Sequence, residues 1–255
     1  MWHTLFNVYG PISVHSYGLM IAIGLLIFLY LIKRNPRFHA LKLEDNFMGI
    51  LLVGIIAGLV GGRLLFLATA PELFSSPFDL IAFWQGGFRI LGAVIAIVLT
   101  LPFYLSWIKV PIIPLLDLLA IYAPILQSIS RIGCFLAGCC HGIPTTRPWG
   151  IIYTDAQSSA PLYVCLHPTQ LYSAIGLMAI FAAMYFLFQH RFERAGQLIS
   201  IYIGLVSLER FVIDFWRGDR EVGPLFSLDQ HIALALFIVA TIGLIVSTFY
   251  RSRRP

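Results

Sequence analysis

Long apolar segments, each long enough to cross a lipid bilayer, follow one another along almost the whole chain and set the kind of fold it can adopt. The hydrocarbon core of a bilayer is about 30 Å thick, so a helix needs about 20 mostly apolar residues to cross it. Only 11% of the residues are charged, whereas soluble domains carry about 25%. The sequence therefore predicts an all-α, polytopic integral membrane helix bundle of about seven transmembrane helices. The expected spans are Ile12–Ile32, Phe47–Ala68, Ile90–Trp107, Ile112–Ile129, Thr169–Phe188, Leu198–Phe215 and His231–Tyr250.

Pro102 and Pro124 fall inside the third and fourth of these spans. Proline lacks the backbone N–H that an α-helix uses, and its ring crowds the preceding turn. We therefore expect these two helices to be kinked or shortened.

Basic residues gather after alternate spans, and such loops stay in the cytoplasm. This pattern predicts an external N-terminus and a cytoplasmic C-terminus. The net charge of +5 is spread over short clusters between apolar runs, so we expect no nucleic-acid partner. The loops after the first, third, fifth and seventh spans carry Lys33, Arg34, Arg37, Lys42, Lys109, Arg191, Arg194, Arg251, Arg253 and Arg254.

No repeat, low-complexity stretch or linker divides the chain, so residues 1–255 are expected to form a single transmembrane domain. The long non-apolar segments are Cys139–His167 and Trp216–Asp229, and the predicted orientation places both outside. We expect residues 139–167 to form an outward-facing cap. No soluble catalytic domain is expected, so any chemistry takes place in or at the bilayer.

Arginines in and beside the apolar spans are the strongest sign of a functional site, because charge in a bilayer is costly. Arg210, Asp214 and Arg217 are spaced i, i+4 and i+7, so we expect one helix face on which two guanidiniums flank the carboxylate. Arg131 and Arg63 also fall toward the outer half. One guanidinium group can bind two phosphate oxygens through two N–H groups, which favours an anion site. The alternative is an ion-pair network that only fixes helix packing.

Histidine and tyrosine side chains stand near the outer ends of the spans. His15 and Tyr17 open the first span and suit either a lipid headgroup or simple anchoring at the membrane interface. His167 precedes the fifth helix, where a proton acceptor, a headgroup ligand and a capping residue are all open interpretations.

The four cysteines, with His141 and His167, gather around the outer end of the bundle, and three interpretations remain open. The residue types suit zinc, although the spacing matches none of the usual signatures. A disulfide between Cys165 and Cys139 or Cys140 would suit an oxidising side of the membrane. Otherwise Cys134 and its neighbours are small buried residues.

Several ordered motifs resemble the bacterial prolipoprotein diacylglyceryl transferase family over nearly the whole chain. The resemblance implies transfer of a diacylglyceryl group from phosphatidylglycerol to the lipobox cysteine in a prolipoprotein signal peptide. It implies release of glycerol phosphate, no metal or cofactor, and a place among the lipids of the bacterial cytoplasmic (inner) membrane. The motifs are His15-Ser16-Tyr17-Gly18-Leu19-Met20, Gly61-Gly62-Arg63, Trp84-Gln85-Gly86-Gly87, Arg131-Ile132-Gly133 with Phe135 and Gly138, His167-Pro168-Thr169-Gln170-Leu171-Tyr172, and Arg210 with an acid four residues on.

This chemistry expels a phosphate monoester, so fixed positive charge at the leaving phosphate should lower the barrier most. Arg131 and Arg210 are assigned that role, with Arg63 and Arg217 in support. Tyr17 is expected to orient the headgroup, and Gly138 and Gly142 to give it room. We name as catalytic Arg131, Arg210, His141, His167 and Cys134, and as substrate-binding His15, Tyr17, Arg63, Gly138, Gly142, Gln170, Asp214 and Arg217.

The chain departs from the family pattern where a thiol would be activated. Leu91-Gly92 stands in place of the family's His-Gly pair in the third helix. Cys134 replaces an Asn, Cys139 a Glu, and Asp214 a Glu. The lipid-phosphate half of the site is therefore retained and the thiol-activating half is altered.

Three hypotheses follow. In the first, the chain is a transferase whose base is His141 or His167, or whose arginines lower the pKa of the acceptor thiol enough without a base. In the second, it is a paralogue that takes a group from a phosphoglycerol lipid and passes it to a different acceptor. One form of this hypothesis has one of the chain's own cysteines carry the group on the way. In the third, it is a non-catalytic lipid-binding membrane protein.

Overall fold

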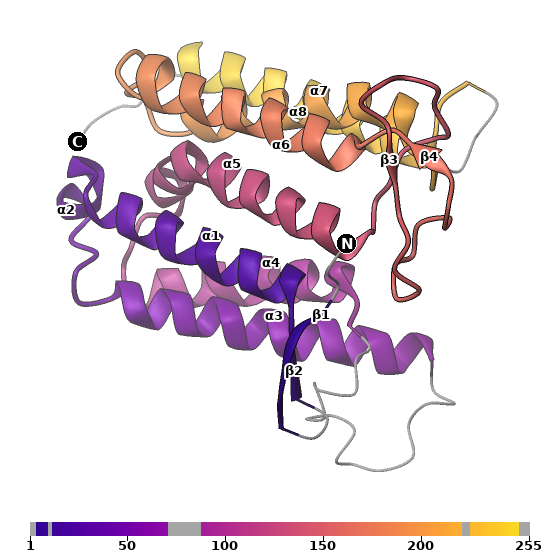
Figure 1. Ribbon diagram of the computed structural model, residues 1–255. Coiled ribbons are helices and arrows are strands. Elements are labelled where there is room, and N and C mark those ends of the chain that lie inside the picture. Colours follow the sequence, from indigo (N-terminus) through magenta and orange to yellow (C-terminus); the bar gives the residue numbers. More distant parts are fainter. Residues whose placement is uncertain (1–3, 10–11, 71–87, 221–224, 250–255) are drawn as a thin grey trace. The chain divides into compact units, whose positions relative to one another are not determined.

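The computed structural model describes residues 4–9, 12–70, 88–220 and 225–249, which are mostly helical (Figure 1). The chain forms two compact units, Asn35–Leu115 and a larger one joining Met1–Arg34 to Leu116–Pro255. The smaller unit contains α2 (Pro36–Ala40), α3 (Phe47–Thr69), α4 (Ile90–Trp107) and the first residues of α5 (Ile112–Ala137). The larger unit contains β1 (Thr4–Tyr9), β2 (Ile12–His15), α1 (Ser16–Lys33), the rest of α5, β3 (Ile151–Ile152), β4 (Cys165–Leu166), α6 (Thr169–Ala182), the π-helix η4 (Ala183–Phe188), α7 (Gln197–Ile213), the 3₁₀-helix η5 (Asp214–Trp216) and α8 (Leu228–Phe249).

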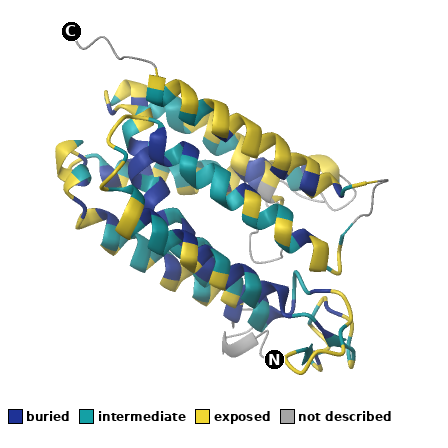
Figure 2. Cartoon of the chain, turned by 90° about the horizontal axis from the view of Figure 1, so that it is seen from above, coloured by how far each residue is buried: buried dark blue, intermediate teal, exposed yellow. Residues whose placement is uncertain are grey.

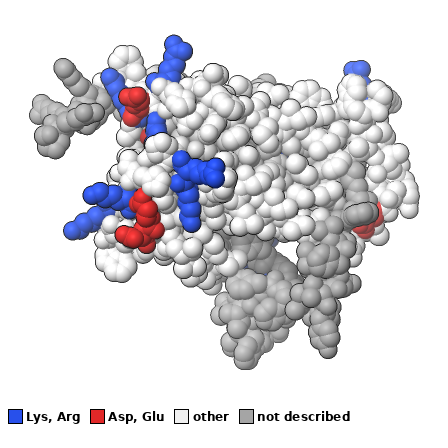
Figure 3. Space-filling model, turned by 60° about the vertical axis from the view of Figure 1, so that its left-hand side comes forward, with Lys and Arg blue, Asp and Glu red and all other residues white. Residues whose placement is uncertain are grey.

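Five helices in the described part of the chain are long and apolar enough to cross a membrane. Large apolar side chains on these helices face outward: Leu26 is 68% exposed, Ile175 70% and Phe249 80%. Exposed residues run along the helices in Figure 2, and most of the face in Figure 3 carries no charged side chain. A soluble protein rarely exposes so much apolar surface to water, whereas lipid chains can cover it. The prediction of a helical, multi-pass membrane protein is therefore confirmed. The five helices are Ser16–Lys33, Phe47–Thr69, Ile112–Ala137, Thr169–Phe188 and Leu228–Phe249, and a shorter apolar helix covers Leu91–Trp107.

Two expectations concern the helix ends. α4 continues past Pro102 to Trp107 and α5 continues past Pro124 to Ala137, so neither proline shortens its helix, and the kink at each proline stays a prediction. A break inside a bilayer would leave several backbone groups without partners, whereas a proline removes only one hydrogen bond. The first helix begins at Ser16, because Ile12–His15 instead pairs antiparallel with β1. Apolar and polar residues alternate in that stretch, which is typical of a strand.

In the smaller unit, α3 and α4 approach closely through glycines. A Cβ atom at Gly61 would lie 2.5 Å from the backbone oxygen of Gly92, too close for any side chain. The backbone N–H of Arg89 donates to the Gly62 oxygen at 3.1 Å. Small residues at such crossings let membrane helices pack backbone to backbone. A Cβ atom at Gly92 would likewise lie 2.3 Å from the Gly61 oxygen, so Gly92 is needed for the close packing of α4 against α3.

In the larger unit, polar side chains connect the helices. Ser128 Oγ on α5 donates to the backbone oxygen of Ala174 on α6 at 2.8 Å. Asp117, near the start of α5, accepts from the backbone N–H groups of Gly196 (2.6 Å) and Ile199 (2.8 Å) at the beginning of α7. A carboxylate at a helix N-terminus satisfies free N–H groups and complements the helix dipole. Asp117 thus joins α5 to α7.

Asp117→Ala is expected to destabilise the protein by about 2 kcal/mol, because it leaves two N–H groups at a buried helix start without an acceptor. Asp117 is only 2% exposed, so water cannot replace the carboxylate. Thermal unfolding in detergent measures the effect. Asp117→Asn keeps one acceptor oxygen and should fall between Asp117→Ala and the wild type. Equal unfolding temperatures for all three proteins would disprove the role of Asp117.

The segment between α5 and α6 folds over a small apolar core of its own, formed by Tyr153, Ala160 and Leu166. β3 and β4 pair antiparallel within it, and Gly142 forms a bridge with Arg217 beyond η5. The N–H of Ile143 donates to the Trp216 oxygen at 2.9 Å. These bonds fasten the segment beside the end of α7, where most charged residues of the larger unit's candidate site lie.

Candidate functional site

The larger unit contains a small polar pocket at the junction of α5, α6 and α7. α5 contributes Arg131 to it, and the turn after α5 contributes Cys140. The lining residues are Arg131, Cys140, Thr169, Gln170, Ser173, Glu209, Arg210, Ile213 and Arg217.

Three arginines line this pocket, and they differ in how far their charge is offset. Arg210 pairs with Asp229, and Arg217 Nε donates to Asp219 Oδ1 at 2.8 Å. No carboxylate in the described part of the chain lies within ion-pair distance of Arg131. Arg131 therefore brings to the pocket a guanidinium that is not held in an ion pair, and such a group is suited to binding a phosphate.

Asp214 does not lie between Arg210 and Arg217, so the predicted three-residue helix face is wrong. α7 ends at Ile213, and the tighter turn of η5 carries Asp214 away from the α-helical spacing. Asp214 instead accepts from Ser227 Oγ at 2.6 Å and lies 3.4 Å from Arg220 Nε. With 1% of its side chain exposed, it fixes the approach to α8 and does not line the pocket.

Glu209 is the carboxylate that lines the pocket, and the sequence reasoning missed it. Ser173 Oγ on α6 donates to its Oε1 at 2.6 Å. A carboxylate within an apolar span was itself a signal of function, since such residues are rare in membranes. Thr169 and Ser173 were also missed, and small hydroxyl residues in an apolar helix give no comparable signal.

Gln170 lies in the pocket, as the assignment of Gln170 to substrate binding requires. It is 1% exposed, and its Nε2 donates to the Cys139 oxygen at 2.7 Å and to Tyr153 Oη at 3.1 Å. Because a backbone oxygen only accepts, the amide orientation is fixed. No group of the described chain donates to its Oε1. A buried acceptor without a partner is costly, so Oε1 is available to a ligand.

Tyr153 accepts a hydrogen bond from Gln170 and so helps to hold its side chain in place. Burial raises the pKa of Tyr153 to about 12, so its hydroxyl remains protonated at neutral pH. That hydroxyl contacts the backbone oxygen of Phe135 at 3.4 Å. Together these residues hold the turn after α5 against α6.

Gly138 and Gly142 shape that turn and do not line the pocket. Gly138 ends α5 with a φ of 72°, a left-handed conformation that glycine adopts freely. Its carbonyl accepts from Ser158 Oγ at 3.0 Å. A Cβ at Gly142 would lie 2.5 Å from the His167 oxygen. The room expected for a headgroup at these glycines is therefore filled by protein atoms.

His141 and His167 are also outside the set of pocket-lining residues. His141 Nδ1 lies 3.1 Å from the Gly142 oxygen. His167 Nδ1 lies 3.0 Å from Tyr172 Oη, which also accepts from Trp149 Nε1 at 2.7 Å. Both imidazoles therefore have structural contacts within the segment after α5.

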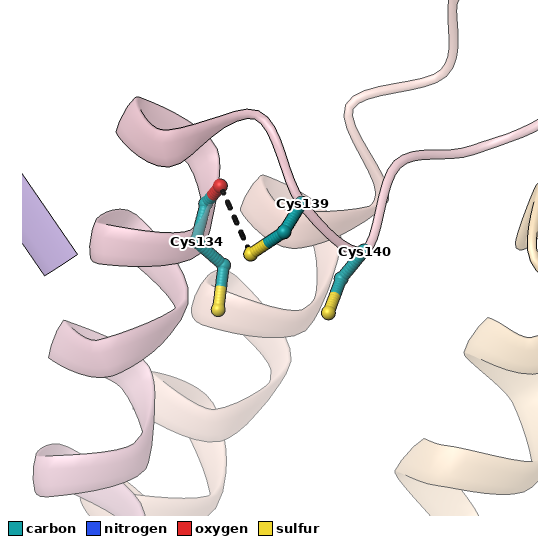
Figure 4. Close-up of side chains that lie close together, drawn as sticks. All are labelled: Cys134, Cys139 and Cys140. Atoms are coloured by element: carbon teal, nitrogen blue, oxygen red, sulfur yellow. Dashed lines mark hydrogen bonds between the residues drawn. The ribbon is translucent and has the colours of Figure 1, made fainter. Parts of the chain in front are cut away.

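Three cysteines form a compact cluster beside the pocket (Figure 4). The Sγ atoms of Cys134, Cys139 and Cys140 all lie within 4.8 Å of one another. Cys139 Sγ is 3.7 Å from the Cys134 oxygen. All four cysteines are free, and Cys165 lies in β4 against Gly150. The disulfide interpretation is therefore not what the structure contains.

Ionisation within the cluster is unequal. Hydrogen bonds from the Cys134 and Cys139 thiols lower the pKa of Cys140, and the charges of Arg217 and Arg131 act in the same direction. Hydrogen bonding to Cys134 and Cys140, together with burial, raises the pKa of Cys139. Cys140, which lines the pocket, is thus the group that ionises first.

Of the other predicted residues, His15 and Tyr17 lie at the start of α1, and Arg63 lies inside α3. His15 is the exposed N-cap of α1, and Tyr17 lies in the first turn. A Cβ at Gly133 would lie 3.3 Å from the Tyr17 Cα, so α1 meets α5 two residues beyond Arg131. Arg63 is buried in α3 of the smaller unit, with its guanidinium 5.5 Å from the Phe66 ring centre. Trp84-Gln85-Gly86-Gly87 lies outside the described residues.

Comparison with known proteins gives consistent matches over almost the whole chain. Residues 3–246 match the family described as "Prolipoprotein diacylglyceryl transferase". A phosphatidylglycerol–prolipoprotein diacylglyceryl transferase of Clostridium tetani is 33% identical over 98% of both chains. The second such protein of Clostridium perfringens is 31% identical over 91% of this chain and 90% of its own. That of Thermotoga maritima is 28% identical over 93% and 82%.

Proposed function

The chain belongs to the prolipoprotein diacylglyceryl transferase family, and we propose that it transfers the diacylglyceryl group of phosphatidylglycerol to a cysteine thiol of a prolipoprotein. The resemblance found from the sequence motifs is thereby confirmed. The observation that carries the proposal is the pocket in which Arg131, Arg210 and Arg217 converge.

The arginines act on the leaving group. The thiol sulfur attacks the carbon of the diacylglyceryl group that is bonded to the phosphate oxygen. A C–S bond forms there, and the C–O bond between that carbon and the phosphate breaks. Negative charge grows on the departing glycerol phosphate. Fixed donors aimed at developing charge supply the largest share of such catalysis. Arg131, which has no carboxylate partner in the described chain, contributes most.

Glu209 takes the proton of the incoming thiol. It is the carboxylate that lines the pocket, and Ser173 fixes its orientation. A base is effective when it lies within hydrogen-bond reach of the proton that it removes. Glu209 lines the pocket, which supports its role as the base for a thiol bound there, whereas His141 and His167 do not line it.

Gln170 Oε1 accepts a hydrogen bond from the glycerol headgroup of the lipid. Phosphatidylpropanol, whose headgroup lacks both hydroxyls, should therefore be used about tenfold less efficiently, the value of about one hydrogen bond. Comparing kcat/KM for the two lipids in mixed micelles measures the difference. The preference should disappear in Gln170→Met, whatever its overall rate. Equal use of both lipids by the wild type would contradict this contact.

The proposal extends to membrane topology. The chain crosses the bacterial cytoplasmic (inner) membrane about seven times, with its N-terminus outside and its C-terminus in the cytoplasm. Residues 139–167 then form an outward-facing cap within one transmembrane domain. The acceptor is the lipobox cysteine of a signal peptide, which reaches the pocket from the same side. The distribution of lysine and arginine supports this orientation.

Complementation tests the proposal. In a bacterial strain depleted of its own diacylglyceryl transferase, the chain should restore growth and convert accumulated prolipoprotein to the lipid-modified form. The chain carrying Arg131→Ala, produced at the same level, should do neither. A wild-type chain that reaches the membrane and leaves prolipoprotein unmodified would contradict the proposal, and lipid binding without transfer would then favour a non-catalytic role.

A further inference from the structure

The cysteine cluster beside the arginine pocket has no part in the transfer as derived so far. Cys134 comes from the last turns of α5, and Cys139 and Cys140 follow the helix end. Their three Sγ atoms lie within 4.8 Å of one another and point into a shared space in Figure 4. Three buried or half-buried thiols so close together are a ligand set for a soft metal ion.

We propose that Cys134, Cys139 and Cys140 bind a zinc ion, whose fourth position takes the thiol of the acceptor peptide. The inference rests on the proposed transfer, because it names the group that activates the acceptor. Zinc sites with three protein ligands and one open position are typical of catalysis. Three cysteines in the described chain meet that pattern.

The distances suit this metal after a small adjustment. A Zn–S bond of about 2.3 Å places the sulfurs of a tetrahedral site about 3.8 Å apart. Since every Sγ pair already lies within 4.8 Å, small side-chain rotations bring the sulfurs to that spacing. No rearrangement of the helices is needed.

The backbone of the turn is held in the conformation that gathers the sulfurs. Cys140 has a φ of 56°, which a non-glycine residue adopts rarely. Its carbonyl accepts from Thr169 Oγ1 at 3.0 Å, and the Cys139 carbonyl accepts from Gln170 at 2.7 Å. Such a conformation persists only where surrounding bonds enforce it, and it is common at functional sites.

Positively charged side chains near the cluster stabilise a zinc ion bound by three thiolates. Zn²⁺ bound by three thiolates carries a net charge of −1, and an acceptor thiolate raises it to −2. Cys140 lines the same pocket as Arg131 and Arg217, so this negative charge has cationic neighbours. The arginines thus stabilise the loaded site as well as the leaving phosphate.

The chemistry balances without a redox step. The acceptor thiol binds zinc and loses its proton to Glu209, because a thiol bound to zinc is readily deprotonated. Its sulfur then attacks the glycerol carbon, the C–S bond forms, and the C–O bond breaks with both electrons going to the leaving phosphate. Zinc has no redox chemistry and remains on the three cysteines.

Metal content tests the site independently of activity. The wild-type protein, purified in detergent without metal-affinity chromatography, incubated with Zn²⁺ and then desalted, should hold one zinc ion per chain by plasma mass spectrometry. Cys139→Ser and Cys140→Ser should lose it. Cys165→Ser should retain it, because Cys165 lies in β4 outside the cluster. Substoichiometric zinc in the wild type, or equal zinc in all four proteins, would overturn the site.

Cobalt tests the open position. Co²⁺ bound in place of zinc should give a sulfur-to-metal charge-transfer band that grows when a peptide with a lipobox cysteine is added, and does not grow with the matched serine peptide. An unchanged band would overturn the role in binding the acceptor. Full transfer by metal-free protein would remove the zinc proposal and leave the transferase standing. Stoichiometric zinc without any transfer would instead refute the proposed function.

Discussion

Arg131→Ala should lower kcat/KM for diacylglyceryl transfer by about 10²–10³-fold, the loss expected when one fixed donor to a developing charge is removed. Arg131 lines the pocket, and it forms no ion pair with a carboxylate in the described chain. Unlike Arg210 and Arg217, its guanidinium is therefore not held by an aspartate and can bind the leaving phosphate. The initial rate of thioether formation on a lipobox peptide measures the effect.

Two matched variants make this result specific. Arg147→Ala removes the same charge from an exposed position outside the pocket and should leave the rate unchanged. Arg210→Ala should cost less than Arg131→Ala, because Asp229 already offsets part of the Arg210 charge. Wild-type activity in Arg131→Ala would remove the leaving-group role.

Glu209→Gln should lower the rate by about 10²-fold or more, the usual contribution of a positioned base. Glutamine keeps the size of the side chain and a hydrogen-bond acceptor for Ser173, so the pocket should remain folded. The variant's activity should rise with pH as the acceptor thiol ionises by itself near its ordinary pKa of about 8.5. The wild type should instead lose activity at acidic pH, as Glu209 becomes protonated.

The pH profile separates the proton-transfer role from a structural one. Glu193→Gln changes an exposed glutamate outside the pocket and should keep the wild-type profile. A Glu209→Gln protein with a lower rate and an unchanged pH profile would show that Glu209 only maintains the pocket. A wild-type rate would exclude both roles.

The sequence predicted those features that depend on composition and local spacing. Arg131 and Arg217 stood out because charge is costly beside apolar spans, and both line the pocket. The predicted pairing of Arg210 with Asp214 failed because it assumed an α-helix through Asp214, whereas α7 ends at Ile213. Helix ends depend on hydrogen bonds made by distant residues, here Ser227 to Asp214.

The segment after α5 was the least predictable part of the site. Its course depends on long-range hydrogen bonds, such as those from Thr169 and Gln170 to the carbonyls of Cys140 and Cys139. Short strands and a left-handed Cys140 leave no periodic pattern in a sequence. Sequence reasoning therefore named the cysteines but left open which of them meet.

The central claim is tested most directly by mass spectrometry of a synthetic lipobox peptide after incubation with the purified, zinc-loaded protein and phosphatidylglycerol. The account predicts one diacylglyceryl group on the peptide cysteine and one glycerol phosphate released for each group transferred, with both products formed about 10²–10³-fold more slowly by Arg131→Ala. Consumption of the lipid with an unmodified peptide, or a peptide modified equally by both proteins, would contradict it.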